Sequence, residues 1–119
     1  MFNIIARNQD DHTKNIAFLM DRRGEWSLAP AFDVTYAYNP DGAWTFQHQM
    51  SLAGKRDGFV RADLVAAASA ADIKKRRAEE ILDEVFAAVK RWKSFAQQAG
   101  IATPMIDSIR KALRVGMKP

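Results

Sequence analysis

The sequence predicts a mainly α-helical fold with one β-hairpin. Two observations predict the helices: apolar side chains recur with helical spacing along residues 74–98, and a Thr103-Pro104 pair precedes a second amphipathic stretch. One observation predicts the hairpin, because the apolar segment 16–20 and the segment 25–28, which is similar in length, flank the polar turn 21–24. At 119 residues and 48% hydrophobic content, the chain can form one domain or part of one.

The N-terminal half is organised around the hairpin. Residues 2–7 are apolar with one basic end, and we interpret them as the last part of a helix. Gly24 can supply the positive φ that a short hairpin turn needs. Because the two arms are similar in length, the chain that runs out after Asn15 should return with Asp33 beside it. Apolar residues occupy both faces of the strands, so we expect the hairpin to be buried on both sides, partly by the later helices.

The segment from 36 to 60 has no clean period and is rich in aromatic residues. We expect it to be irregular, with a short strand somewhere between Thr45 and Leu52. Two interpretations stay open: its aromatic residues pack onto the helices, or the segment helps to receive a substrate. Three helices are predicted to follow it: 61–70, 74–98, and a third that opens with Thr103-Pro104 as cap and first residue and ends at Gly116.

The ends of the long second helix carry their own signals. Asp72 is a plausible N-cap, and Gly100 stands where a helix stop belongs. Four cations, Lys74 to Arg77, lie at the start of this helix, where they oppose its dipole. A solvated basic face is the simpler interpretation, and contact with nucleic acid or an acidic partner is the alternative. The domain boundaries we predict are 1–35, 36–60 and 61–119, all within one domain.

The spacing of three polar residues points to phosphoryl transfer. Asp10 and Asn15 are separated by four residues, and Asp33 follows eighteen residues after Asn15. This spacing resembles the catalytic loop of eukaryotic protein kinases, which has a base Asp, then a metal-binding Asn, then a second metal-binding Asp. On that likeness Asp10 is the catalytic base, and Asn15 and Asp33 are the ligands of Mg²⁺. Asp11 competes with Asp10 for the base role, and the offset to Asn15 favours Asp10.

The motifs resemble those of one family in particular. The string N-x-D-D-H-x-K-N over residues 8–15 and W-S-L-A-P-A-F-D-V over 26–34 are similar to the C-terminal part of HipA-type serine/threonine kinases, and the likeness continues through 48–56. The resemblance implies a kinase-like C-terminal lobe in which Asn8, His12 and Lys14 support the site residues. It also implies ATP as phosphate donor, Mg²⁺, a protein substrate, a toxin role and a HipB-like antitoxin, with DNA reached only through that antitoxin.

The resemblance also sets an expectation about activity. A HipA-like kinase carries its ATP-binding region before the catalytic loop, and here only nine residues precede Asp10. The six glycines are scattered, so none of them forms a Gly-rich phosphate loop. We therefore expect the chain to correspond to the second half of a kinase and to be inactive alone. Activity would need the N-terminal region, either on the same chain or on a second one.

Three other interpretations are weaker but remain open. Asp10, Asp11 and His12 could hold a metal ion for hydrolysis, although adjacent side chains rarely point at one ion. The same three residues could simply cap a turn through side-chain hydrogen bonds. The whole chain could also be a non-catalytic interaction fragment that inherited the motif. The apolar hairpin favours self-association, so a homo-oligomer is expected if nothing else covers it.

Bulk properties exclude several classes. The sequence has no cysteine, so it has neither a disulfide framework nor a thiol nucleophile. Its formal charge of +4 is mild and indicates a solvated basic surface before it indicates nucleic-acid binding. No apolar run approaches the roughly 20 residues of a membrane span, and the first residues do not form a signal peptide. A cytoplasmic protein is the expectation.

Overall fold

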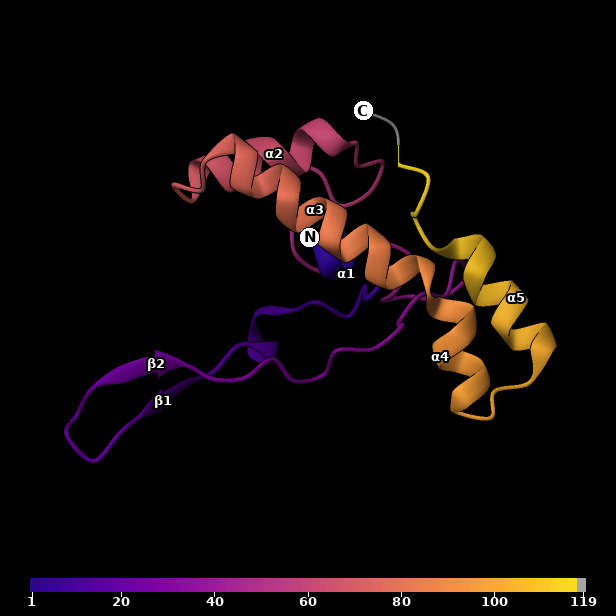
Figure 1. The fold of residues 1–119 in the computed structure, drawn as a ribbon, viewed down its shortest axis with the longest axis horizontal. Helices are drawn as coiled ribbons and strands as arrows, with labels where there is room; N and C mark the ends of the chain where they lie inside the picture. The colour runs from indigo at the N-terminus through magenta and orange to yellow at the C-terminus, as the bar shows by residue number, and fades with distance from the viewer. Residues whose placement is uncertain (118–119) are drawn as a thin grey trace.

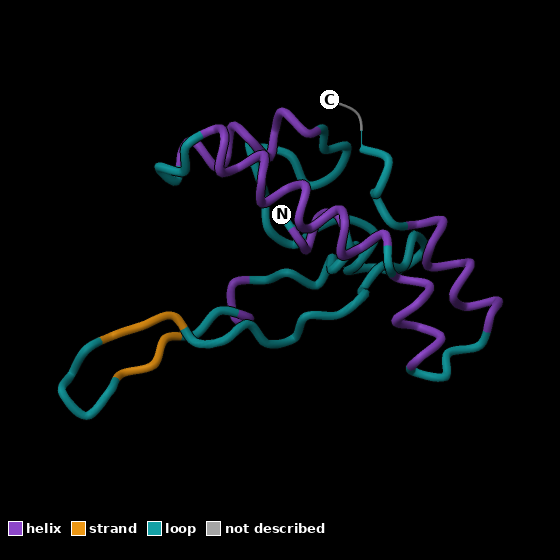
Figure 2. The backbone as a smooth tube through the Cα atoms, viewed as in Figure 1, coloured by secondary structure: helices purple, strands orange, loops and turns teal. Residues whose placement is uncertain are grey.

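The computed structural model describes residues 1–117 and shows a mainly helical chain with one two-stranded hairpin (Figures 1 and 2). The elements run in the order α1 (Phe2–Ile5), β1 (Phe18–Met20), β2 (Trp26–Leu28), α2 (Arg61–Ala70), α3 (Lys75–Lys90), α4 (Trp92–Gln98) and α5 (Thr103–Ala112). Within the described residues, none of the helices has both the length and the apolar character needed to cross a bilayer.

The core lies where α1 and α2 meet the long helix α3. Helix α3 crosses the middle of the molecule, with α1 behind it and α2 alongside (Figure 1). Its apolar stripe faces this junction, because helical spacing places residues four apart on one side. The buried core residues are Ile4, Ile5, Ala6, Phe59, Leu64, Leu82, Phe86 and Val89. Helix α1 has only four residues and depends on this packing, as a helix so short is marginal alone.

The predicted single helix over 74–98 is wrong, because the chain breaks at Arg91 into α3 and α4. The N–H of Arg91 bonds to the carbonyl of Ala88 as well as to that of Val89, so the helix tightens and changes direction. Packing fixes the new direction: the indole N–H of Trp92 donates to the carbonyl of Ile106 on α5 at 3.0 Å. The apolar stripe continues through this break, which is why periodicity alone did not reveal it.

Several predicted helix ends shift by a few residues. Asp72 is not the N-cap of α3: it has a positive φ of 58°, and Lys74 occupies the cap position. Thr103 is the first residue of α5 rather than its cap, which is Ala102, and α5 ends at Ala112, before Gly116. The stop at Gly100 is confirmed by its φ of +72°, a conformation that glycine adopts without a Cβ penalty.

The hairpin is confirmed, but its predicted burial is wrong in the described structure. Phe18 pairs with Leu28 and Met20 with Trp26 in an antiparallel register. The hairpin extends away from the helices (Figure 1), and all six strand residues are exposed. The Cα radius of gyration is 15.7 Å, larger than the about 13–14 Å of a compact chain of this length. The sequence pattern predicts the hairpin correctly, but it does not indicate whether another part of the protein covers the strands.

The chain from 29 to 60 has no regular helix or strand (Figure 2), so the predicted strand between Thr45 and Leu52 is wrong. Isolated backbone bridges replace it. Leu52 pairs with Lys55 in a tight turn, and Asn8 pairs with Ala37. The second bridge holds the segment after Asp33 against residues 7–9.

Candidate active site

Asn15 and Asp33 meet at the open end of the hairpin. The carboxamide Nδ2 of Asn15 donates to Oδ2 of Asp33 at 2.9 Å, although the residues are 18 apart in sequence. Asn15 ends a single 3₁₀ turn over Thr13–Asn15, after which the chain extends into the first strand. The predicted approach of Asp33 to Asn15 is therefore confirmed. The hairpin makes this contact, because its second arm brings the chain back to the point at which the first arm begins.

The backbone at Asp33 is held in an uncommon conformation. Its φ is +54°, in the left-handed region, where Asp is one of the few non-glycine residues found with any frequency. The buried Asn8 side chain holds it there, because its Nδ2 donates to the carbonyl oxygen of Asp33 at 3.0 Å. Such strain persists only when neighbours determine it, and it concentrates at functional sites.

Asp10 joins the pair through its backbone, and its carboxylate remains accessible. The carbonyl oxygen of Asp10 accepts a second hydrogen bond from Nδ2 of Asn15 at 3.1 Å. The Asp10 side chain is 47% exposed, and its Oδ1 lies 3.9 Å from Nε2 of His12. His12 is thus placed to support Asp10, whereas Lys14 is exposed at the end of the 3₁₀ turn.

The oxygen atoms of this site suit a hard divalent cation. The Nδ2 group of Asn15 donates to both Asp10 and Asp33. The orientation of the amide is therefore fixed, and its Oδ1 points away from these two acceptors. Carboxylate and carboxamide oxygens are the ligands that Mg²⁺ prefers. One further polar atom nearby, the buried Oδ1 of Asn8, has no hydrogen-bond partner among the described residues. Asn15 and Asp33 therefore bring the two ligand types together, and the Asn15 amide would have to turn about its χ2 for its Oδ1 to bind the same ion as the Asp33 carboxylate.

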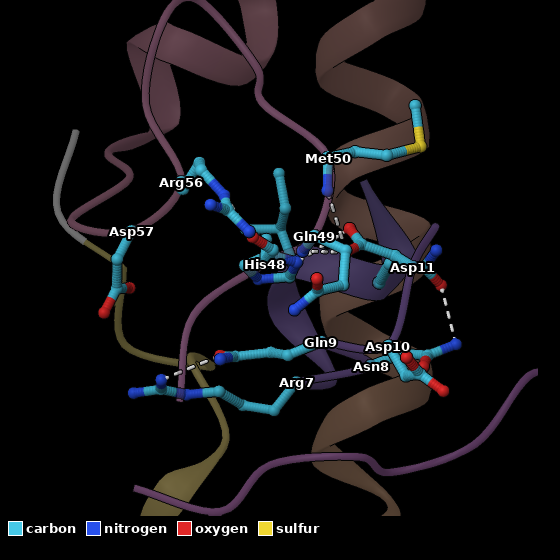
Figure 3. A network of polar contacts seen from close by, with 12 residues as sticks. Arg7, Asn8, Gln9, Asp10, Asp11, His48, Gln49, Met50, Arg56 and Asp57 are labelled. Carbon is cyan, nitrogen blue, oxygen red and sulfur yellow. Dashed lines mark hydrogen bonds and ion pairs between the residues drawn. The ribbon is translucent and has the colours of Figure 1, made fainter. Parts of the chain in front are cut away.

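Asp11 points away from this site and into the protein. Its Oδ2 accepts from Nδ1 of His48 at 2.8 Å, and its Oδ1 accepts from the backbone N–H groups of Gln49 at 2.8 Å and Met50 at 3.3 Å (Figure 3). Burial raises the pKa of Asp11, but these hydrogen bonds lower it by more, so the pKa lies below its ordinary value. Asp11 is therefore an ionised anchor, which leaves Asp10 as the candidate base.

Sequence reasoning missed a buried polar network behind the turn that carries Asp10. Gln9 and His48 are almost fully buried. The side chain of Gln9 accepts from Nη1 of Arg7 at 3.0 Å (Figure 3). It also donates to the carbonyl of Thr45 at 3.0 Å. Arg114 reaches the same network from the C-terminal end of the described chain. The stretch around His48 was part of the family likeness, but nothing in the sequence marked Arg114.

The alternative of a hydrolytic metal centre finds little support in the geometry. Across residues 1–117, no group of three His, Cys, Asp or Glu side chains is placed to share an ion. The reason is visible in the turn itself: Asp11 faces His48 while Asp10 faces His12. The turn-capping interpretation is wrong for Asp11, because its side chain accepts the backbone N–H groups of Gln49 and Met50, which are distant in sequence, and not those of its own turn.

The fold and this site define a mainly helical domain with one hairpin, at whose open end Asn15 and Asp33 meet. Residues 1–93 match the family model of the HipA-like C-terminal domain. This match covers more than half of the chain, and the chain therefore belongs to the family of HipA-like C-terminal domains. Neither the curated proteins nor the solved structures gave a match.

Proposed function

We propose that the chain is the C-terminal part of a HipA-like serine/threonine protein kinase, the toxin of a toxin–antitoxin pair. The observation that supports this most strongly is the contact of Asn15 with both Asp33 and the backbone carbonyl of Asp10, whose carboxylate is 47% exposed. Phosphoryl transfer consists mostly of positioning and charge stabilisation, so a base beside two oxygen ligands is the part a C-terminal lobe has to supply.

Asp10 is the proposed catalytic base. Its carboxylate would accept the proton of a serine or threonine hydroxyl as the hydroxyl oxygen attacks the γ-phosphate of ATP. Accessibility supports this role, because a protein substrate must reach the carboxylate directly. His12, 3.9 Å from Asp10, would orient it.

Asn15 and Asp33 would hold Mg²⁺. When bound, the ion would supply positive charge that offsets the negative charge of the phosphates during transfer. Other residues of this chain hold Asn15 and Asp33 in place. The carbonyl of Asp10 fixes the amide of Asn15, and the side chain of Asn8 fixes the backbone of Asp33. These neighbours hold Asn15 and Asp33 close together before any ion binds.

We propose that an N-terminal ATP-binding region, in cis or in trans, completes the nucleotide site, and that this chain has no turnover without it. A HipB-like antitoxin is the proposed regulatory partner, through which DNA would be reached indirectly.

A test compares the wild-type chain with Asp33→Ala, each alone and together with the N-terminal half of a HipA-like kinase. We expect Mg²⁺-dependent ATP binding and phosphate incorporation only for the wild-type chain with that half. Asp41→Ala is the matched control, because Asp41 is an exposed carboxylate in a turn away from the site. Metal-dependent binding that survives Asp33→Ala would refute the metal assignment, and turnover by the chain alone would refute its dependence on the missing region.

A non-catalytic interaction fragment is the second candidate. The exposed apolar hairpin favours it, since Trp26 and Leu28 are 68% and 67% exposed and lie on the same short strand. On this hypothesis the hairpin associates with a second copy or with the antitoxin. The absence of phosphate incorporation in every combination above would favour this candidate over the kinase.

A further inference from the structure

The two residues that flank Asp10 in sequence are both held by one arginine. Arg114 lies beyond the part of the chain that matches the family, and its side chain is 11% exposed. Its Nη2 donates to Oε1 of Gln9 at 3.3 Å, and its Nη1 lies 2.9 Å from Nε2 of His48. His48 in turn bonds to Asp11 at 2.8 Å. Arg114 therefore contacts Gln9 directly and Asp11 through one imidazole.

The chemistry of these contacts determines which ring nitrogen of His48 carries the proton. An arginine guanidinium can only donate hydrogen bonds, so Nε2 of His48 must carry a lone pair and accept. The ring proton then resides on Nδ1, which donates to the carboxylate of Asp11. The imidazole is neutral and bridges a cation and an anion, with its dipole aligned to both. A protonated imidazole would place an N–H against the guanidinium and lose that bond.

Other contacts fix Arg114 itself. Its backbone N–H donates to the carbonyl of Ile5 at 3.0 Å, and its Nη1 donates to the carbonyl of Ile4 at 2.9 Å. Nη2 also pairs with the carboxylate of Asp57. Burial and the nearby charge of Arg7 lower the pKa of Arg114 from its ordinary value, while the pairing with Asp57 acts the other way. The guanidinium is thus anchored to α1, which packs in the core.

We propose that Arg114 is a positioning residue for the catalytic turn, acting on Asp11 through the neutral Nδ1–H tautomer of His48 and on Gln9 directly. The link to catalysis rests on the proposed function of Asp10, whereas the physical coupling does not. The consequence is that the segment after α5 fixes the direction of the Asp10 carboxylate, although it contributes no group that touches a substrate.

The coupling can be measured on the 119-residue chain by NMR. The chain has two histidines, so the ring ¹⁵N signals are simple to assign. We expect the wild-type His48 to show a protonated Nδ1 and an unprotonated Nε2. Arg114→Met should remove this fixed tautomer. It should also speed hydrogen exchange of the Gln49 and Met50 amides by about tenfold or more, as expected when a buried charge-assisted network opens. Arg110→Met is the matched control, because Arg110 is 58% exposed and forms an ion pair with Asp107 on the surface of the same helix.

A second variant separates positioning from a general loss of folding. His48→Asn retains a donor near the position of Nδ1 but removes the acceptor that Arg114 uses. If Arg114 acts through His48, adding Arg114→Met to His48→Asn should change the exchange of Gln49 and Met50 much less than it does in the wild type. Equal effects in the two backgrounds, or unchanged exchange in Arg114→Met, would overturn the proposal. Where Arg114→Met does not fold, Arg114→Lys replaces it in the same cycle.

Activity provides a separate readout when the N-terminal half is supplied. Arg114→Lys should lower kcat with little change in the KM for ATP, because the base is misdirected while the metal ligands are retained. A raised KM with unchanged kcat would contradict positioning of the base. If no form of the protein transfers phosphate but the NMR coupling is present, the kinase assignment fails and the positioning network stands.

Discussion

Replacing Asp11 by alanine should destabilise the protein far more than replacing an exposed carboxylate with similar bonds. Asp11 accepts three hydrogen bonds, from His48 and from the backbone of Gln49 and Met50, and its side chain is 9% exposed. Its removal leaves three donors without an acceptor in a site that water reaches poorly. Breaking such a buried charged cluster costs about 3–5 kcal/mol, a large part of the stability of a small domain.

The matched control is Asp21→Ala at the hairpin turn. Asp21 also accepts two backbone N–H groups, those of Arg23 at 2.7 Å and Glu25 at 3.0 Å, but water surrounds it. Urea unfolding followed by circular dichroism should show a midpoint lower by about 2 M for Asp11→Ala and a much smaller change for Asp21→Ala. Asp11→Asn should fall between the two, because it keeps the oxygen that the backbone groups use. Equal midpoints for the two alanine variants would show that burial does not determine how much stability is lost when the carboxylate is removed.

Two further predictions concern pH and association. Because the pKa of Asp11 is lowered in the folded state, its contribution to stability is complete above its ordinary pKa and is lost as the pH falls through the lowered value. The urea midpoint of the wild type should therefore fall below about pH 4, and a parallel fall in Asp11→Asn would show that another group is responsible. Trp26→Lys should reduce self-association in sedimentation velocity, whereas Trp44→Lys, at a position 74% exposed but outside the hairpin, should not. A wild-type chain that remains monomeric at high concentration would contradict the expected association.

The parts of the fold that the sequence predicted are those set by local chemistry. The hairpin follows from two apolar segments around a glycine turn, and α2 matches its predicted bounds of 61–70. The approach of Asp33 to Asn15 was predictable because it depends only on two arms of similar length. Each of these features is decided by residues close together in the chain.

The parts that sequence missed depend on contacts between distant residues. His48 lies 37 residues from Asp11, and Arg114 lies 66 residues from His48. No periodicity or motif reports such pairs, because each residue alone is compatible with a solvated surface. The break at Arg91 was missed for a related reason, since the contact between Trp92 and Ile106 that directs α4 forms only in the folded protein.

The hairpin has a consequence for how this region can change in length. Asn15 and Asp33 lie at its open end, while the turn at Gly24 lies at the far end and has open space around it. Residues added in matched pairs next to the turn would lengthen the arm and keep the strand register, so the two candidate ligands would stay in place. The tip is therefore a natural position for a fluorescent label or an inserted epitope that leaves the chemistry undisturbed.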